Sequence, residues 1–169
     1  MLNPKIQESL NEQVNAELFS AYLYLSMSAY FETQNLAGMA NWMRIQAQEE
    51  MVHVMKFYDF INQRDGQVKL IQIEAPKTQW SSALEAFEDA YAHECKISGL
   101  INERVDLAIS EKDHAANTFL QWFVTEQVEE EATALSIVDK LKLAADNSVA
   151  LLMLDAELGQ RTLPSPAAE

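Results

Sequence analysis

The segment DGQVKLIQIEAPKTQWSS, residues 65–82, decides the fold because it separates two long helical patterns with an extended stretch. Asp65-Gly66 is a helix-stop signal, and Ser82 with Glu85 has the capping-box spacing that opens a new helix. An extended stretch of about 15 residues can span roughly 50 Å, whereas a helix of about 28 residues is roughly 42 Å long. The segment can therefore run the full length of a helical bundle, which makes the helices on its two sides parallel.

Helical signals fill the rest of the chain, whose 169 residues include only four glycines and four prolines. Asn3-Pro4 resembles an N-cap followed by proline at the first helical position, and Asp113 can cap a later helix. We expect helices at residues 4–33, 36–64, 82–111, 113–143 and 148–158, followed by a tail at residues 159–169. The pattern predicts one all-α domain over residues 1–169: a four-helix bundle with one long crossover between helices two and three and a short fifth helix.

The charge and cysteine content exclude several classes of protein. A formal net charge of −14 argues against nucleic acid as a partner and fits cations as ligands, although acidity more often serves solubility. Cys95 is the only cysteine, so a disulfide framework and a Cys-x-x-Cys metal motif are both excluded. The first residues, MLNPKIQESL, lack an apolar signal core, and the chain has no apolar run of about 18 residues. We expect a cytoplasmic protein without membrane contact.

Ligand-type side chains interrupt the apolar stripe of every long helix. In the first helix, Glu17 lies on the stripe formed by Ile6, Leu10, Val14, Ala21 and Leu25. The comparable residues are Glu50 and His53 in the second helix, Glu94 in the third, and Gln127 and Glu130 in the fourth. One such residue in each helix lies within about three residues, or roughly 5 Å, of the helix midpoint. All four helices therefore bring a ligand-type side chain to one level of the core.

Any single glutamate of this kind is more often paired or turned to the surface. Four at one level are different, because buried carboxylates protonate unless they have counter-charge, and no lysine or arginine lies on these stripes near mid-depth. Two divalent ions would balance the charges of Glu17, Glu50, Glu94 and Glu130. One imidazole, several oxygens and no thiolate favour iron or manganese over structural zinc, and spacing alone does not separate iron from manganese.

Three segments resemble the first, second and fourth helices of the ferritin family: NEQVNAELFSAYLYLSMSAYF, QEEMVHVMKFYDFINQRDG and FLQWFVTEQVEEEA. The resemblance covers nearly the whole chain and is greatest to the non-haem ferritins of bacteria and archaea. It implies a ferritin-like bundle that assembles into a hollow shell of 24 copies. Such a shell takes up Fe(II), oxidises it with dioxygen or hydrogen peroxide, and stores a ferric mineral.

The resemblance also implies roles for single residues. Glu17, Glu50 and His53 would bind the first iron, with Glu50 bridging, and Glu94, Gln127 and Glu130 would serve the second. Tyr24 would hydrogen-bond a ligand or donate an electron, unless it is an ordinary core tyrosine. Glu49, Glu126 and Glu129 resemble the third iron site of bacterial ferritins, the alternative being an acidic solvated face.

Departures from related patterns narrow the expected function. Gln127-x-x-Glu130 stands where bacterioferritin would show a second Glu-x-x-His, so a non-haem protein is favoured and no haem is expected. The alternative function is a di-iron redox or peroxide-detoxifying enzyme without mineral storage, although one cysteine excludes the rubredoxin-like module of the rubrerythrin type. A storage shell without catalysis would lack the mid-depth ligands. A DNA-protecting mini-ferritin would lack the fifth helix and the long crossover, and its DNA binding conflicts with the charge of −14.

Overall fold

The computed structural model describes residues 2–163, and helices dominate this range. They are α1 (Pro4–Thr33), α2 (Ala37–Gln63), α3 (Ala83–Ser110), α4 (His114–Ala144) and α5 (Ser148–Leu158). Each end lies within one residue of the expected boundary; most of the small differences arise because the expected ranges included capping residues, and α4 runs one residue further than expected. No helix between residues 2 and 163 combines the length and apolar character needed to cross a bilayer.

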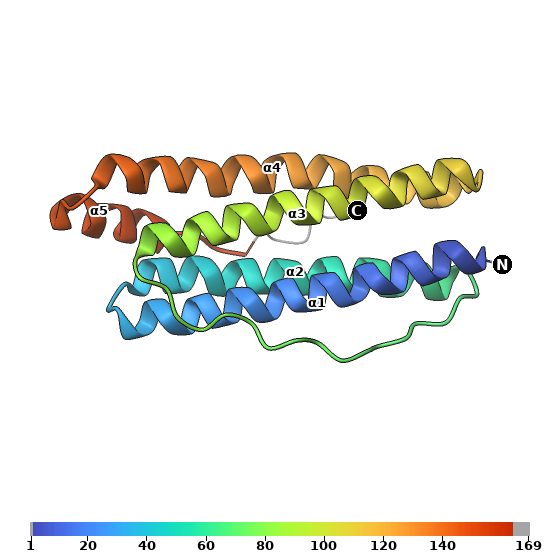
Figure 1. Cartoon of the computed structure of the whole chain (residues 1–169), viewed down its shortest axis with the longest axis horizontal. Helices are drawn as coiled ribbons and strands as arrows, with labels where there is room; N and C mark the ends of the chain where they lie inside the picture. Colours follow the sequence, from blue (N-terminus) through green and yellow to red (C-terminus); the bar gives the residue numbers. More distant parts are fainter. Residues whose placement is uncertain (1, 164–169) are drawn as a thin grey trace.

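The crossover has the course that its sequence predicts (Figure 1). It leaves the end of α2 and runs along the outside of the bundle to the start of α3 at the opposite end. As a result α2 and α3 are parallel, whereas α1 with α2 and α3 with α4 form antiparallel pairs. The all-α fold with one long crossover and a short fifth helix is thereby confirmed.

Local side-chain caps define the starts of four helices. Asn3, Ser82, Asp113 and Asn147 each accept a hydrogen bond from a backbone N–H in the first turn of α1, α3, α4 and α5 respectively. At the end of α2 the left-handed backbone falls on Asp65, with φ of 54°, rather than on the glycine that follows it. Aspartate tolerates this conformation better than most residues.

The start of α2 is capped from a distance. Leu36 supplies no side-chain hydrogen bond; instead Oδ1 of Asp155 in α5 accepts one from the N–H of Met39, at 2.8 Å. The two helices approach so closely here that a Cβ on Gly38 would lie 1.7 Å from the carbonyl oxygen of Asp155. Glycine at position 38 therefore allows α5 to close this end of the bundle, where it contacts α2 and α4.

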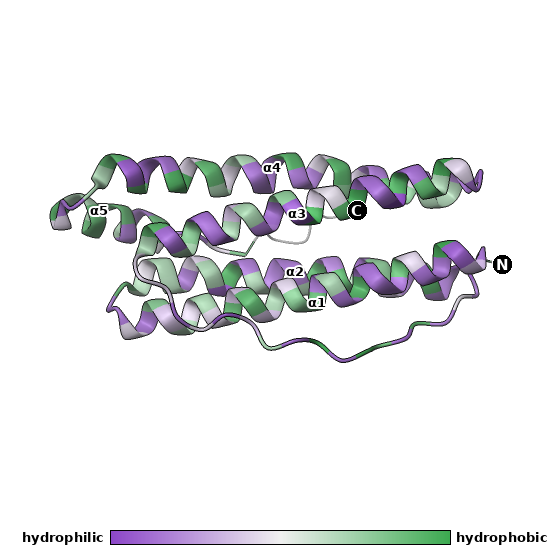
Figure 2. Ribbon diagram, viewed as in Figure 1, coloured by the Kyte–Doolittle hydropathy of each residue, from purple (hydrophilic) through white to green (hydrophobic). Residues whose placement is uncertain are grey.

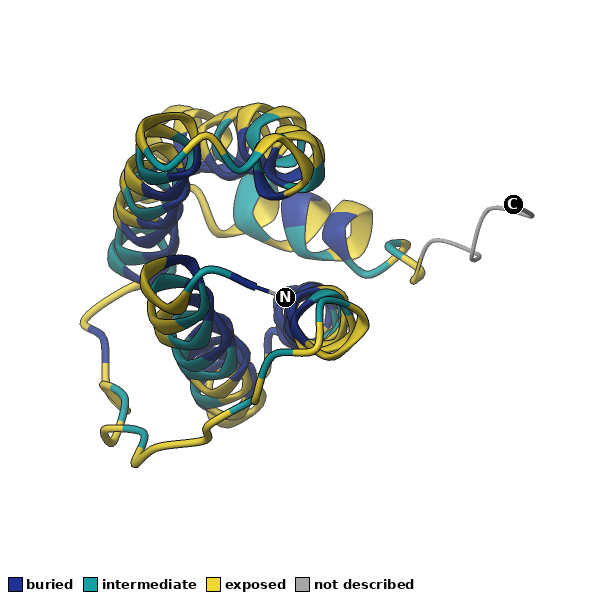
Figure 3. Cartoon of the chain, turned by 90° about the vertical axis from the view of Figure 1, so that its right-hand side faces the viewer, coloured by how far each residue is buried: buried dark blue, intermediate teal, exposed yellow. Residues whose placement is uncertain are grey.

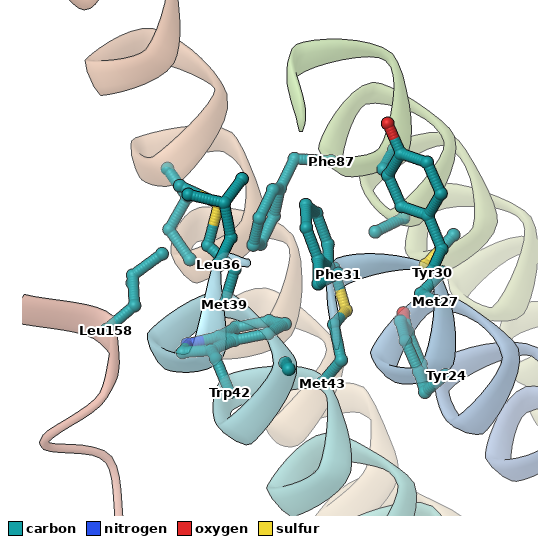
Figure 4. Packing of buried hydrophobic residues seen from close by; sticks show 14 of the residues in the cluster. Tyr24, Met27, Tyr30, Phe31, Leu36, Met39, Trp42, Met43, Phe87 and Leu158 are labelled. Carbon is teal, nitrogen blue, oxygen red and sulfur yellow. The ribbon is translucent and has the colours of Figure 1, made fainter. Parts of the chain in front are cut away.

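Buried apolar residues form two separate cores inside the bundle, and the inward faces of the helices are buried throughout (Figure 3). The core beside α5, here the α5-end core, includes Phe31, Met39, Trp42 and Phe87, whose side chains pack together in Figure 4. The N-terminal core includes Leu10, Phe57, Ile101 and Phe123. Hydrophilic residues recur along every long helix, interspersed with hydrophobic ones (Figure 2).

One residue of the expected α1 stripe lies elsewhere. Leu25 is 50% exposed, whereas Ile6, Leu10, Val14 and Ala21 are buried. Leu25 is four residues beyond Ala21, so the expectation followed a fixed step of four, which drifts around a helix of 3.6 residues per turn. The buried face is continued by Tyr24 and Met27 instead.

Candidate metal centre

A layer of buried polar side chains separates the two apolar cores. On α1 the layer residue Glu17 lies between the core residues Val14 and Leu23, and on α2 Glu50 and His53 lie between Ala47 and Val54. The polar layer consists of Gln13, Glu17, Gln46, Glu50, His53, Glu94, Gln127 and Glu130, none more than 7% exposed. Six of these eight are the ligand candidates expected from the sequence, and all six are buried at one level of the bundle.

The α1–α2 side of the layer brings three candidates together. Glu17, Glu50 and His53 each offer a ligand atom, and these atoms all lie within 4.8 Å of one another. Nδ1 of His53 is 3.3 Å from Oε2 of Glu50, one turn earlier on α2. Two carboxylates and one imidazole at this spacing can hold a single metal ion.

The α3–α4 side is arranged differently. Nε2 of Gln127 donates to Oε2 of Glu94, at 3.1 Å, and to the Glu94 carbonyl oxygen, at 3.2 Å. Glu130 has a ligand atom within 4.8 Å of those of His53 and Glu126, whereas Glu94 joins neither ligand group among residues 2–163. His53 thus belongs to both groups and stands between the two sides.

Two buried glutamines in the layer were not foreseen from the sequence. Nε2 of Gln13 donates to Glu17 at 2.8 Å. Nε2 of Gln46 donates to Glu50 at 3.1 Å and to Glu130 at 2.9 Å, so it joins α2 to α4. Each glutamine precedes a ligand candidate by four residues, which places the pair on one helix face. This four-residue spacing is the feature of the sequence that could have indicated both glutamines.

Burial dominates the electrostatics of the layer. It raises the pKa of Glu17 from 4.5 to about 8, with the charge of Glu50 acting in the same direction. Burial also raises the pKa of Glu130 to about 7, again with help from a neighbouring carboxylate, Glu94. The pKa values of Glu50 and Glu94 are raised for the same first reason. Each group therefore resists ionisation unless a cation arrives.

The protein itself supplies little positive charge to the layer. Arg104 is the only buried lysine or arginine between residues 2 and 163. Its Nη1 donates to the carbonyl oxygen of Leu100, and its Nη2 lies 3.5 Å from Glu12 rather than from a layer carboxylate. Oε2 of Glu17 has no hydrogen-bond partner in the described chain. An oxygen-rich, anionic site with one imidazole suits a divalent transition metal such as iron.

Aromatic rings border the layer. The Tyr24 hydroxyl donates to Oε1 of Glu94, and burial raises the Tyr24 pKa well above 10, so the phenol keeps its proton. The Tyr24 ring meets His93 edge to face, with centroids 6.1 Å apart, and Nε2 of His93 is 2.7 Å from the Ser20 hydroxyl. The Trp122 ring lies edge to face on His53, at 5.5 Å. Tyr24 thus contacts a ligand candidate directly.

The three residues expected to form a third iron site are placed unequally. Glu126 joins His53 and Glu130 in the second ligand group. Glu49 is half-buried and forms an ion pair with Arg161. Glu129 is exposed and belongs to neither ligand group among the described residues. Burial raises the pKa of Glu49; the charge of Arg161 opposes this shift, and the charge of Glu126 adds to it.

Comparison with known proteins places this arrangement in a family. Residues 7–144 match the model of the ferritin-like domain. The chain is 47% identical to a bacterial non-heme ferritin of Bacteroides fragilis over 95% of this chain and 100% of the relative. It is 41% identical to a bacterial non-heme ferritin of Staphylococcus saprophyticus, over 96% and 97% of the two chains.

Solved structures agree with the sequence relatives. The open pore ferritin of the archaeon Archaeoglobus fulgidus superposes with a TM-score of 0.95 at 52% identity, covering 96% of this chain and 100% of the other. Both the fold and the sequence match therefore extend over nearly the whole molecule. With a buried carboxylate and histidine layer at the centre of such a bundle, the chain belongs to the ferritin family.

Proposed function

We propose that this chain is an iron-storage subunit of the non-haem ferritin class, with ferroxidase activity at the polar layer. The observation that carries the proposal is the set of four carboxylates and one histidine at a single level, almost fully withdrawn from water and without a buried lysine or arginine beside them. Two Fe(II) ions supply the missing positive charge. The family relationship, at 47% identity to a bacterial non-heme ferritin, supports the same function.

The two iron ions have different sets of ligands in this proposal. Glu17, Glu50 and His53 bind the first ion, and their mutual proximity within 4.8 Å supports that grouping. Glu94, Gln127 and Glu130 serve the second ion, with Glu50 bridging. The charge of Glu94 and that of Glu130 both act on Glu50, which supports its central position.

The protein residues prepare the site by controlling protons. Because burial raises the carboxyl pKa values, the iron-free layer holds protons that leave when Fe(II) binds. Gln13 and Gln46 fix the orientation of Glu17, Glu50 and Glu130 through their amide N–H groups. Tyr24 holds the Glu94 carboxylate in place through the hydrogen bond that its hydroxyl donates.

The reaction balances with either expected oxidant. Two Fe(II) ions give up two electrons, which with two protons reduce one dioxygen to hydrogen peroxide or one hydrogen peroxide to two waters. Carboxylates favour the product, because Fe(III) gains more than Fe(II) from anionic ligands.

A third iron position at Glu49 and Glu126, with Glu129 beside it on α4, extends this proposal. Glu49 and Glu126 interact electrostatically with each other, and Glu49 also interacts with His53. Glu129 lies one turn from Glu126 and is exposed, so it would join only through a side-chain movement.

Assembly and cellular location complete the proposal. We expect a homo-oligomeric shell of 24 subunits in the cytoplasm that encloses the mineral. Large apolar side chains on the surface of α1 and α5 support burial against other copies of the chain, since three of those on α5 are spaced to share one helix face and an exposed apolar patch marks an interaction surface. They include Tyr22, Leu25, Val149, Leu152 and Met153.

The double substitution Glu50→Ala with His53→Ala tests the function. It removes the bridging carboxylate and the imidazole, so rapid aerobic Fe(II) oxidation should fall roughly 100-fold or more while the shell still assembles. Stopped-flow absorbance measures the oxidation, and light scattering measures the assembly. Glu8→Ala, which removes an exposed carboxylate near the N-terminus, is the control and should oxidise iron normally.

Two results would change this assignment. An unchanged oxidation rate in the double variant would overturn the polar layer as the ferroxidase centre. Fast oxidation by the unsubstituted protein without retained ferric mineral would favour the alternative, a di-iron redox or peroxide-detoxifying enzyme that does not store iron.

A further inference from the structure

The end of α5 and the segment that follows it lie against α2 and are held there by several contacts. Oδ1 of Asp155 caps the N–H of Met39 at 2.8 Å. Nδ2 of Asn41 donates to the carbonyl oxygen of Arg161 at 3.0 Å, and lies 3.4 Å from that of Gly159. These contacts fix the backbone of Arg161 beside α2, so its side chain can reach residues further along that helix.

The Arg161 side chain ends on the acidic flank of the metal centre. Its Nη2 donates to Oε2 of Glu49, the residue that precedes the bridging ligand Glu50. Its guanidinium lies over the Trp42 ring, 4.3 Å from the centroid. The side chains of Arg161 and Glu49 are 19% and 15% exposed, so the pair is largely shielded from water. A shielded pair is stronger than the average surface salt bridge.

The Arg161–Glu49 ion pair leaves part of the guanidinium without a partner. Nη1 of Arg161 is buried without a hydrogen-bond partner in the described chain, so only part of the guanidinium is satisfied. Among residues 2–163 the ligand groups near Glu49 offer no further lysine or arginine, since Glu126 there belongs with His53 and Glu130. Arg161 therefore supplies, next to Glu49, positive charge of the kind that a metal ion would bring.

We propose that Arg161 is the resident counter-ion of the third iron position and competes with Fe(II) for the Glu49 carboxylate. The proposal rests on the function given above and adds a regulatory residue to it. When the third ion is absent, Arg161 neutralises Glu49; when the ion binds, the guanidinium leaves. Because such a competition is reciprocal, Arg161 weakens the third position and leaves the two layer positions to fill first.

Anaerobic calorimetric titration with Fe(II) tests this competition. In Arg161→Gln, the weakest of three binding steps should tighten on the order of tenfold, because the ion no longer displaces a charge-assisted hydrogen bond. The two tighter steps should not change. Arg44→Gln is the matched control: it removes the same charge from α2, where Arg44 lies 3.8 Å from Glu32 on the exposed side. This control should leave all three steps unchanged.

A second background isolates the pair. Glu49→Gln should remove the third step, and adding Arg161→Gln to it should then have no further effect. Circular dichroism verifies that each variant folds, and Arg161→Lys, which keeps the charge, should bind the third ion with intermediate affinity. An Arg161→Gln protein whose third step is absent, unchanged or weaker overturns the proposal, as does an equal gain in Arg44→Gln. If the titration of the unsubstituted protein lacks the two tight binding steps, the proposed function itself is refuted.

Discussion

The apolar cores and the polar layer between them are buried to the same degree, but their side chains find very different interaction partners. In the α5-end core, Phe31 and Phe87 are fully buried and their ring centroids lie 5.6 Å apart, with Trp42 5.4 Å from Phe87. In the polar layer, Glu17 is equally buried, yet one of its carboxyl oxygens has no hydrogen-bond partner among residues 2–163. Equal burial thus stabilises the fold in one region and destabilises it in the other.

The difference has a physical cause. Removing an aromatic side chain from water is favourable, whereas removing an ionised carboxylate without a counter-charge is costly. Two apolar cores, one on each side, supply the stability that lets the bundle hold a layer of unfavourably buried acids. The binding of iron then gives back part of the free energy that the layer costs. Three changes would break or sharpen this contrast.

Phe87→Ala should have the largest effect on the fold. Removing this buried ring from the α5-end core leaves a cavity and should lower the free energy of unfolding by about 3–5 kcal/mol. Chemical denaturation followed by circular dichroism measures the loss. Leu70→Ala in the crossover, where the side chain is 67% exposed, serves as the control and should cost little. A Phe87→Ala protein as stable as this control would contradict the assigned role of the core.

The pH dependence of stability should show the opposite character of the layer. Burial raises the pKa of Glu17 to about 8 and that of Glu130 to about 7, so near neutral pH the folded iron-free chain binds more protons than the unfolded chain. Stability therefore falls as pH rises through these values. Between pH 6.5 and 8, the melting temperature should drop on the order of several degrees.

The pH range begins at 6.5 because below that value His93 changes the stability in the opposite direction. Burial lowers the pKa of His93 to about 4, so His93 contributes stability that increases with pH up to its unfolded value near 6.5. Differential scanning calorimetry, with and without anaerobic Fe(II), makes the measurement. Fe(II) should reduce the drop because it binds the ionised carboxylates. A melting temperature that rises between pH 6.5 and 8 in the iron-free protein would be incompatible with this account.

Glu17→Gln should change stability the least of the three, but the change should be a gain, which is unusual for a substitution at a buried position. The amide has the shape of the acid but no charge to bury, so at pH 8 the iron-free variant should gain about 1 kcal/mol of stability. At pH 6.5 the gain should shrink, since Glu17 is already protonated there. Denaturant titration at both values measures it, with Glu8→Gln as an exposed control. Fe(II) affinity at the first position should weaken in the same variant. A loss of stability at pH 8 would contradict the view that the buried Glu17 carboxylate costs stability in return for binding iron.

Much of this contrast could be predicted from residue spacing. The capping signals at Asn3, Ser82 and Asp113 act through residues two or three positions away, so local sequence was sufficient to place them. The six layer candidates followed from helical periodicity combined with depth, which depends only on position along each helix. Leu25 departed from its expected place because the buried face turns around a long helix.

Other features depend on partners that are distant in the chain. The four-residue spacing between Gln46 and Glu50 is a local signal, but the bond from Gln46 to Glu130 requires α4 beside α2. The cap on α2 comes from Asp155, more than a hundred residues later. No local pattern connects Arg161 with Glu49, and none indicates that Glu129 turns to solvent while Glu126 turns inward.

By itself the sequence determined the helices, the crossover and the depth of the acids, because each depends on local periodicity and chain length. Only the tertiary structure decided which acids share a ligand group, how the amides orient them, and which cation lies beside Glu49. Those outcomes depend on distances between helices, which packing sets and spacing along one helix does not specify.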